Sequence, residues 1–253
     1  MIDPFYSVRY AEEIDSTNLW IKRLHEEGAP EGTTAVADCQ TAGRGRRGRS
    51  WISPKGESIP FSILLKPSVP PERTPMLSPV MGLAVCDALS EITGKKAQIK
   101  WPNDVVISGK KICGILTELI MENDEEPYVI IGTGINNGSR EFPEELKDRA
   151  TSILLETGRK ADRGEVLEKV LNIFLADYRQ FLRDGDLQSL AGRYNRELIN
   201  RDREVLITGK DMTVRATARG IDRTGALIIE KEDGTTEAVS SGEVSVRGLY
   251  GYT

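Results

Sequence analysis

The sequence has few cysteines and a single histidine, and both shortages exclude classes of protein. The three cysteines, Cys39, Cys86 and Cys113, form neither a C-x-x-C pair nor a cysteine–histidine motif. They therefore predict buried thiols in a reducing cytoplasm rather than a disulfide scaffold or a zinc site. The only histidine, His25, lies in an expected helix, which argues against nucleophilic serine–histidine catalysis.

The sequence also has no excess of positive charge and no long apolar run. Thirty-four Lys and Arg residues against 39 Asp and Glu residues give a net charge of −5, which argues against coating nucleic acid or an anionic membrane. Any anion site must therefore be local. No uncharged run approaches the roughly 18 residues of a membrane helix, and the N-terminus has no signal-peptide core. We expect a soluble cytoplasmic protein without a membrane partner.

Three segments have apolar residues at helical spacing. The first begins at Ser16 and ends before Gly28, and the second runs from Leu77 to Ile92 before Gly94. The third begins after Asp162, with Glu165 at capping-box spacing, and ends before Gly185. The sequence therefore predicts three helices, of which the third has the most complete signals.

Strand-like runs lie between these helices, at 34–39, 60–66, 112–120 and 128–135. After Asn200 the pattern changes to short alternating strands separated by Thr-Gly and Asp-Gly turns, typical of a small β-barrel. We therefore expect an α+β fold with a catalytic domain at 1–200 and a small β-domain at 201–253.

The most unusual segment is GRGRRGR at 43–49, with four arginines and no acid between Asp38 and Glu57. Close guanidinium groups repel one another unless an anion sits among them, and the glycines let the backbone approach a ligand. A phosphate or carboxylate ligand fits, and so does a solvated basic loop or a nucleic-acid patch. A dinucleotide turn does not fit, because the following residues, with Pro54 and Gly56, would not form a helix.

Three further motifs place polar residues near strand ends or helix starts. KWPND at 100–104 predicts a turn that presents Asn103 and Asp104, and Lys111 is the last charge before an apolar strand. GTGIN at 132–136 fits either a close approach to a ligand or a strand bend, and 16–18 would ordinarily cap a helix. Without the other motifs, Lys111 would be interpreted as a solubilising residue at the end of a strand.

Taken in chain order, six motifs resemble those of biotin protein ligases. They are Ser16-Thr17-Asn18, GRGRRG at 43–48, KWPND at 100–104, Lys111 with GILTEL, GTGIN at 132–136 and GEVSVR at 242–247. Each motif is weak alone, but six in the family's order are specific. The resemblance implies a mixed β-sheet flanked by helices, as in class II aminoacyl-tRNA synthetases, followed by an SH3-like β-barrel. One departure is Pro60, where relatives more often carry no proline.

The resemblance also implies roles for particular residues. Catalysis is expected from Lys111 and Arg46. Biotin binding is expected from Ser16, Thr17, Asn18, Gln40, Arg44, Gly45, Arg46, Lys111 and Gly114. Nucleotide binding is expected from Arg44, Arg46, Trp51, Asp104, Lys111 and Asn136. No protein ligand for a metal is assured, although Mg²⁺ near Asp104 is one expectation.

The expected function is an ATP-dependent ligase that makes biotinyl-5′-AMP and transfers biotin to a lysine of a biotin carboxyl carrier protein. The resemblance implies biotin, ATP and Mg²⁺ as substrates and cofactor, and a homodimer formed through the catalytic sheet. The alternatives are a lipoate or octanoate ligase or transferase, a module that only binds biotin, and a DNA-binding repressor. Only fifteen residues precede Ser16, which predicts no helix-turn-helix module and no nucleic-acid partner.

Overall fold

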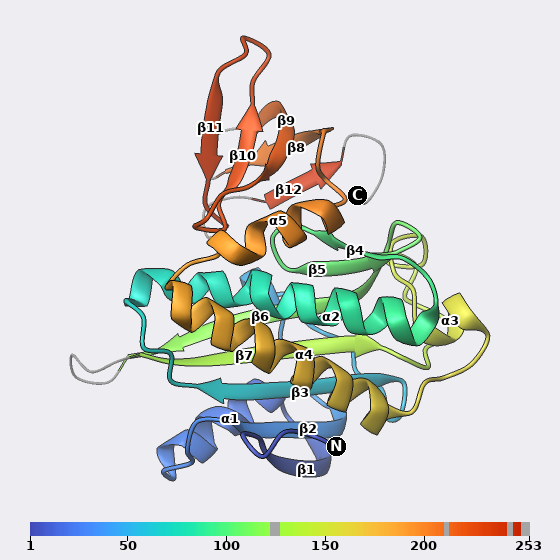
Figure 1. Ribbon diagram of the computed structural model, residues 1–253. Helices are drawn as coiled ribbons and strands as arrows, with labels where there is room; N and C mark the ends of the chain where they lie inside the picture. The colour runs from blue at the N-terminus through green and yellow to red at the C-terminus, as the bar shows by residue number, and fades with distance from the viewer. Residues whose placement is uncertain (122–126, 210–212, 242–244, 249–253) are drawn as a thin grey trace.

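The computed structural model describes residues 1–121, 127–209, 213–241 and 245–248, and it contains two β-sheets (Figure 1). The larger sheet has seven strands in the order β1-β2-β3-β7-β6-β5-β4. Only β1 and β2 run parallel, and all other neighbours are antiparallel. The strands are β1 (Ser7–Ile14), β2 (Thr33–Gln40), β3 (Ser58–Leu65), β4 (Ala97–Lys100), β5 (Asp104–Ile107), β6 (Lys110–Ile120) and β7 (Tyr128–Asn136).

Helices cover both faces of this sheet. Helix α1 (Thr17–Glu26) packs on β2, β3 and β7, and α2 (Leu77–Thr93) packs on the opposite face beside α4 (Arg163–Asp184) (Figure 1). Alternate residues of β7 point to opposite faces. Ile131 and Ile135 lie in the core with α2, whereas Ile130 packs with Ile21 of α1. The face that carries α1 is the one on which the pocket lies.

The three expected helices are confirmed, and the expected local signals are present at the start of α4 and at the ends of α2 and α4. The Asp162 side chain accepts a hydrogen bond from the Glu165 amide at the start of α4. Gly94 and Gly185 follow α2 and α4 in the left-handed conformation, with φ of 66° and 70°. Glycine adopts this conformation at little steric cost. These ends are local, which is why sequence was enough to predict them.

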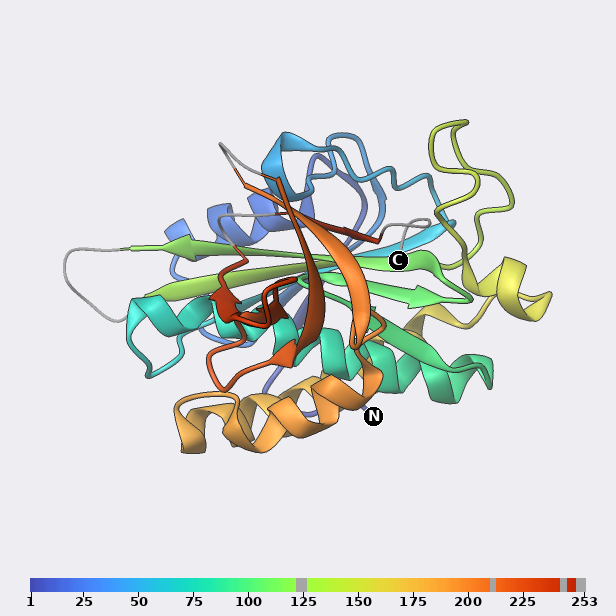
Figure 2. The ribbon, with the colours of Figure 1, turned by 90° about the horizontal axis from the view of Figure 1, so that it is seen from above.

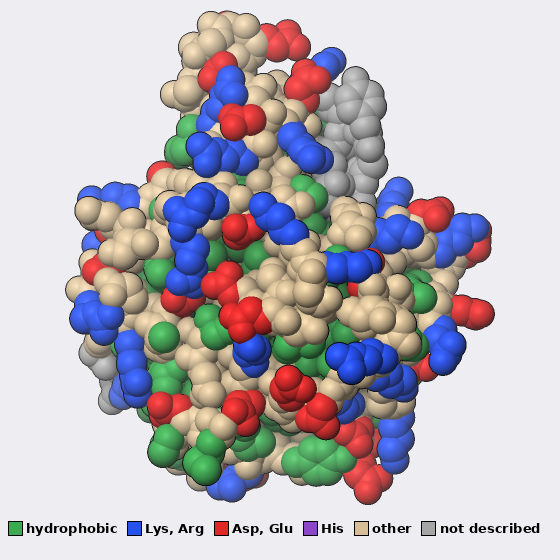
Figure 3. Space-filling model, turned by 45° about the vertical axis from the view of Figure 1, so that its right-hand side comes forward, with side chains coloured by type: hydrophobic (Ala, Val, Ile, Leu, Met, Phe, Trp, Pro, Cys, Tyr) green, Lys and Arg blue, Asp and Glu red, His purple; other side chains and the backbone are tan. Residues whose placement is uncertain are grey.

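One helical stretch of the described residues, Pro71–Thr93, is long and apolar enough to cross a membrane by length and composition. It comprises a short 3₁₀ helix, η2 (Pro71–Met76), followed by α2. Sixty-seven per cent of its apolar window is buried inside the structure. Such burial is typical of a helix in the core of a folded protein. The surface shown in Figure 3 carries charged side chains of both signs, interspersed with one another.

The second sheet lies at the C-terminal end of the chain, above the larger one in Figure 1 and across it in Figure 2. Its five antiparallel strands have the order β11-β10-β9-β8-β12. Buried residues of both sheets belong to one hydrophobic cluster, and the Trp101 indole donates to the Gly225 carbonyl at 3.1 Å. Its strands are β8 (Arg203–Thr208), β9 (Thr213–Ile221), β10 (Leu227–Glu230), β11 (Thr236–Val239) and β12 (Ser245–Gly248).

The predicted fold class is confirmed: α+β, with a small C-terminal β-domain. Five further strands and α-helices were not predicted from sequence, namely β1, β4, β5, α3 (Ile153–Thr157) and α5 (Gln188–Glu197). Strand β1 is an edge strand with largely exposed side chains, so it lacks an apolar pattern. Pro60 lies within β3, and β2 pairs with β3 only from Phe61 to Ile63. Pairing on that side therefore ends where the proline removes an N–H donor.

Candidate active site

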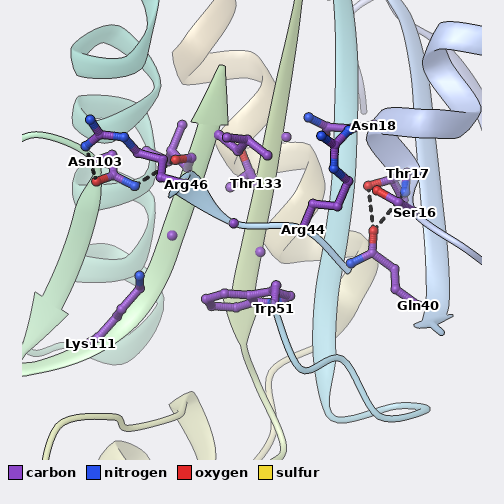
Figure 4. A pocket seen from close by; sticks show the side chains of 16 residues that line it. Ser16, Thr17, Asn18, Gln40, Arg44, Arg46, Trp51, Asn103, Lys111 and Thr133 are labelled. Atoms are coloured by element: carbon purple, nitrogen blue, oxygen red, sulfur yellow. Dashed lines mark hydrogen bonds between the residues drawn. The ribbon is translucent and has the colours of Figure 1, made fainter. Parts of the chain in front are cut away.

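A pocket opens where α1, the basic loop and strands β6 and β7 meet (Figure 4). Segments far apart in the chain supply its walls. All nine residues expected to bind biotin line it. The complete lining is Ser16, Thr17, Asn18, Gln40, Arg44, Gly45, Arg46, Trp51, Asn103, Lys111, Gly114, Ile115, Leu116, Gly132, Thr133 and Gly134.

One end of the pocket is made of amide and hydroxyl groups. Parallel pairing of β1 with β2 sets Ile14 opposite Gln40, so the start of α1 lies beside the end of β2. Gln40 Oε1 accepts from the Thr17 amide at 2.8 Å and from Thr17 Oγ1 at 3.0 Å (Figure 4). The oxygen of the Gln40 amide is thereby used within the protein, which leaves its NH₂ group as the donor at this end.

Ser16 to Asn18 begin α1, but capping does not account for their side chains. Ser16 makes no side-chain cap hydrogen bond. The Ser62 hydroxyl of β3 lies 2.7 Å from Thr17 Oγ1 and 2.6 Å from Asn18 Oδ1, and all three residues are buried. This part of the triplet therefore forms a polar cluster on the sheet rather than a helix cap.

The basic loop between β2 and β3 folds back on itself over the sheet. The Gly45 amide donates to the Arg49 carbonyl at 2.7 Å, and the Trp51 amide donates to the Gly43 carbonyl at 2.9 Å. A single 3₁₀ turn, η1 (Arg46–Gly48), lies at its tip, and no α-helix follows it. The rejection of a dinucleotide turn is therefore confirmed.

Two arginines of this loop have different partners. Arg44 forms an ion pair with Glu118 of β6, at 3.0 Å. Arg46 donates to Asn103 Oδ1 at 3.0 Å and to the Ser241 carbonyl, both neutral acceptors. Burial, reinforced by the neighbouring Arg47 and Arg49, lowers the pKa of Arg46. A half-buried cation whose hydrogen bonds go to neutral acceptors gains strongly from an incoming anion.

The Trp51 indole lies on a flat floor made by two glycines, Gly114 and Gly134, which are register partners on β6 and β7. A Cβ atom at Gly134 would lie 2.4 Å from the indole, and one at Gly114 would lie 3.1 Å from it. The ring therefore fits over Gly134 only because this residue has no side chain, and a side chain at Gly114 would crowd it. This explains Gly134 of GTGIN better than a strand bend does.

Lys111 supplies the cation at the other end of the pocket. Its Nζ forms an ion pair with Asp104 at 2.6 Å and lies 5.6 Å from the Trp51 ring centroid. The register between β5 and β6 shifts beside this residue, between Val105 and Val106. Such irregularities re-aim side chains, and here the lysine points along the pocket rather than into solvent. The turn predicted at KWPND is confirmed, because β4 ends at Lys100 and β5 begins at Asp104.

Two expected nucleotide residues do not line the pocket. Asp104 forms an ion pair with Lys111, which does line it. Asn136 is buried and donates from Nδ2 to the Thr151 carbonyl at 3.0 Å, which ties the end of β7 to a neighbouring segment. Part of GEVSVR, residues 242–244, lies outside the described residues. The nucleotide roles of Asp104 and Asn136 stay predictions.

The described residues contain no group of three or more His, Cys, Asp or Glu side chains that could hold a metal ion. Asp104, the carboxylate expected near a metal, forms an ion pair with Lys111. The donor set therefore does not fit a protein-built metal cage. Mg²⁺ commonly binds one or two carboxylates together with substrate phosphates, and Mg²⁺ near Asp104 stays a prediction of that kind.

Sequence reasoning missed three polar residues around the pocket: Ser62, Asn103 as a partner of Arg46, and Glu118. Each forms a hydrogen bond with a residue that lies 44 to 100 positions away in the sequence. The only signal in the sequence was a polar residue within an apolar strand, at Ser62 and Glu118. Such a residue can equally face solvent, so sequence alone assigned it no role.

Two family models match the chain. Residues 10–136 match the biotin/lipoate A/B protein ligase family, and residues 202–247 match the biotin protein ligase C-terminal domain. The bifunctional ligase/repressor BirA of Bacillus spizizenii is 39% identical over 236 residues, which cover 92% of this chain and 72% of that protein. The biotin–(acetyl-CoA-carboxylase) ligase of Mycobacterium tuberculosis is 35% identical, over 90% of this chain and 85% of that protein.

Solved structures give the same result over the whole chain. The biotin protein ligase from Aquifex aeolicus in complex with biotin and ATP has a TM-score of 0.83 and 37% identity, covering 96% of this chain and 100% of that one. Both the sequence and the fold are therefore similar, and at these identities the likeness extends beyond the fold. The chain belongs to the biotin/lipoate A/B protein ligase family.

Proposed function

We propose that this chain is an ATP-dependent biotin protein ligase, which makes biotinyl-5′-AMP and transfers biotin to a lysine of a biotin carboxyl carrier protein. The observation that carries the proposal is a single pocket with an amide and hydroxyl end at Gln40 and Thr17 and a cationic end at Lys111 and Arg46. The glycine floor under Trp51 joins the two ends.

The two ends match the two parts of such a reaction. A ureido group needs hydrogen-bonding partners, which the Gln40 NH₂ group and the cluster around Thr17 and Asn18 supply. A carboxylate that attacks the α-phosphate of ATP brings two anions together, and their repulsion grows as water is excluded. Lys111 and Arg46 offset that repulsion where the charges meet. This chemistry requires no histidine.

The remaining assignments follow the same division. We propose that Ser16, Thr17, Asn18, Gln40, Gly45 and Gly114 contact biotin, and that Trp51, Asp104 and Asn136 lie at the nucleotide. Arg44, Arg46 and Lys111 serve both. Trp51 is suited to stacking on adenine because its ring already lies flat on β6 and β7.

The experiment that tests the proposal is incubation of the protein with ATP, labelled biotin and a biotin carboxyl carrier domain. We expect pyrophosphate release, a biotinyl-AMP intermediate and label on the carrier lysine. Omission of ATP should abolish all three. Biotin that binds tightly while no pyrophosphate appears would contradict the proposal and leave a module that only binds biotin.

Lipoate and octanoate are the competing substrates, and the matched family includes lipoate ligases beside biotin ligases. The match of residues 202–247 to the biotin protein ligase C-terminal domain favours biotin. The same assay with lipoate or octanoate and a lipoyl carrier domain separates the two. Faster pyrophosphate release with either acid than with biotin would reassign the substrate.

We also propose a domain division at 1–200 and 201–253, a cytoplasmic location and a homodimer. Burial raises the pKa of the Cys86 and Cys113 thiols, and none of the three cysteines is in a disulfide, as suits a reducing compartment.

For the homodimer, strand β1 is an edge of the larger sheet, with exposed Val8 and Tyr10. Sedimentation of the protein with and without biotin and ATP tests the dimer.

Arg46→Gly should still form biotinyl-AMP but release it before transfer. The variant loses a half-buried charged group that lines the pocket. Hydrogen bonds to such a group are worth about 1.5–3 kcal/mol, so escape of biotinyl-AMP should be roughly ten- to a hundredfold faster. The measurements are free biotinyl-AMP by chromatography and biotin on an unrelated bystander protein. Arg47→Gly is the matched control, because Arg47 is exposed, does not line the pocket and has a φ of 57° that glycine adopts easily. Equal escape from both variants would refute the role.

A further inference from the structure

Glu118 is a carboxylate near the pocket to which the proposed function gives no role. It lies on β6, and its side chain is 29% exposed. Successive residues of a strand face opposite sides, so Glu118 shares the face of Gly114 and Leu116, which line the pocket. Glu118 itself does not line it. Any effect of this residue on a ligand must therefore act through its neighbours.

Those neighbours are two pocket residues from different segments. Glu118 Oε2 accepts a hydrogen bond from Asn18 Nδ2 at 2.6 Å, and Glu118 Oε1 is ion-paired with Arg44 Nη1 at 3.0 Å. Asn18 belongs to the start of α1, and Arg44 belongs to the basic loop. One carboxylate thus connects the amide end of the pocket to the segment that covers it.

At Asn18 the contact fixes which way the side-chain amide points. Asn18 Oδ1 lies 2.6 Å from the Ser62 hydroxyl, and Nδ2 donates to Glu118. A Cβ atom at Gly132 would lie 2.0 Å from Asn18 Oδ1, so the amide rests directly on the β7 backbone. Without the acceptor on Glu118, only the Ser62 hydroxyl would oppose rotation of the amide by half a turn, and a hydroxyl can also accept from the rotated NH₂ group.

At Arg44 the contact fixes both position and charge. The carboxylate holds the guanidinium on the sheet near the beginning of the loop, before the turn that carries Arg46. It also balances the charge of Arg44, as Asp104 balances that of Lys111 at 2.6 Å. Arg46, in contrast, is bonded to neutral acceptors. An entering anion is therefore drawn toward Arg46 and away from the amide end.

We propose that Glu118 is a positioning residue for the ligase reaction. It orients the Asn18 amide and anchors the basic loop through Arg44, so that the pocket is shaped for the uncharged ring end of biotin before biotin enters. The inference rests on the proposed function. It predicts an effect on biotin affinity and product retention rather than on the chemical step.

The test compares Glu118→Ala and Glu118→Gln with the unaltered protein, in the full chain with ATP and biotin. In Glu118→Ala we expect the KM for biotin to rise about tenfold while kcat at saturating biotin stays within about twofold. Glu118→Gln keeps an acceptor for Asn18 but not the charge for Arg44. Glu118→Gln should therefore raise the KM for biotin less than Glu118→Ala does. Both variants should increase the escape of biotinyl-AMP equally.

Two controls separate positioning from general stabilisation. Glu230→Gln removes a strand glutamate paired with Arg219 at 2.9 Å in the second sheet, and it should leave the KM for biotin unchanged. In the Arg44→Ala background, Glu118→Gln should no longer increase the escape of biotinyl-AMP, because coupled residues are not additive.

Three results would overturn the inference: an unchanged KM in Glu118→Ala, a parallel fall in kcat and unfolding temperature that accounts for the loss, or additive effects with Arg44→Ala. A failure of the proposed function is distinguishable from these, because it would appear first as absence of biotinyl-AMP formation by the unaltered protein.

Discussion

Lys111→Ala should reduce biotinyl-AMP formation by about 10²–10³-fold, the loss expected when one preorganised group that stabilises developing charge is removed. The lysine lies at the pocket end where a carboxylate would meet a phosphate, and its Nζ is 2.6 Å from Asp104. In the variant, that carboxylate is left without its cation beside an incoming anion. The measurement is pyrophosphate release in the presence of ATP and biotin.

Lys110→Ala is the matched control for this prediction. Lys110 precedes Lys111 on β6 and does not line the pocket, so its removal should leave pyrophosphate release near normal. Because an unpaired carboxylate can destabilise a protein, thermal unfolding of Lys111→Ala should be measured alongside. Near-normal pyrophosphate release by a folded Lys111→Ala protein would remove Lys111 from the mechanism.

Gly134→Ala should lower activity by about a hundredfold, since a displacement of about 1 Å at a reacting site can cost that much. A methyl group at this position would lie 2.4 Å from the Trp51 ring, so the indole must leave the floor of the pocket. Overpacking at such a site costs about 1–3 kcal/mol of stability, which a folded domain can tolerate. Activity should therefore fall much further than stability.

The measurement for Gly134→Ala is biotin-dependent pyrophosphate release together with the tryptophan emission spectrum, which should change as Trp51 moves. Gly82→Ala is the matched control, because Gly82 is also buried but a Cβ there meets only ordinary contacts of 3.8 Å. It lies inside α2, where alanine favours the helix. If Gly134→Ala kept normal activity and an unchanged emission spectrum, the flat floor would have no functional meaning.

How much of the fold followed from sequence depended on how local each signal was. Helix α4 was predictable because Asp162 and Gly185 act on backbone groups within a turn of themselves. Strand β1 was not, because an exposed edge strand has no apolar face. Helix α5 was also missed. Only two of its residues, Leu190 and Tyr194, are fully buried, so its apolar pattern is short.

The sequence by itself indicated the family and ten of the sixteen residues that line the pocket, most of them through six ordered motifs that are recognised whatever their distances. It could not determine how they act on one another. That Gln40 presents its NH₂ group follows from Thr17, and the floor under Trp51 requires two strands to align Gly114 with Gly134. The tie from Arg44 to Glu118 spans two segments that meet only in the folded protein. Hydrogen bonds, ion pairs and close packing act over a few ångströms, and only the tertiary structure brings such groups that close.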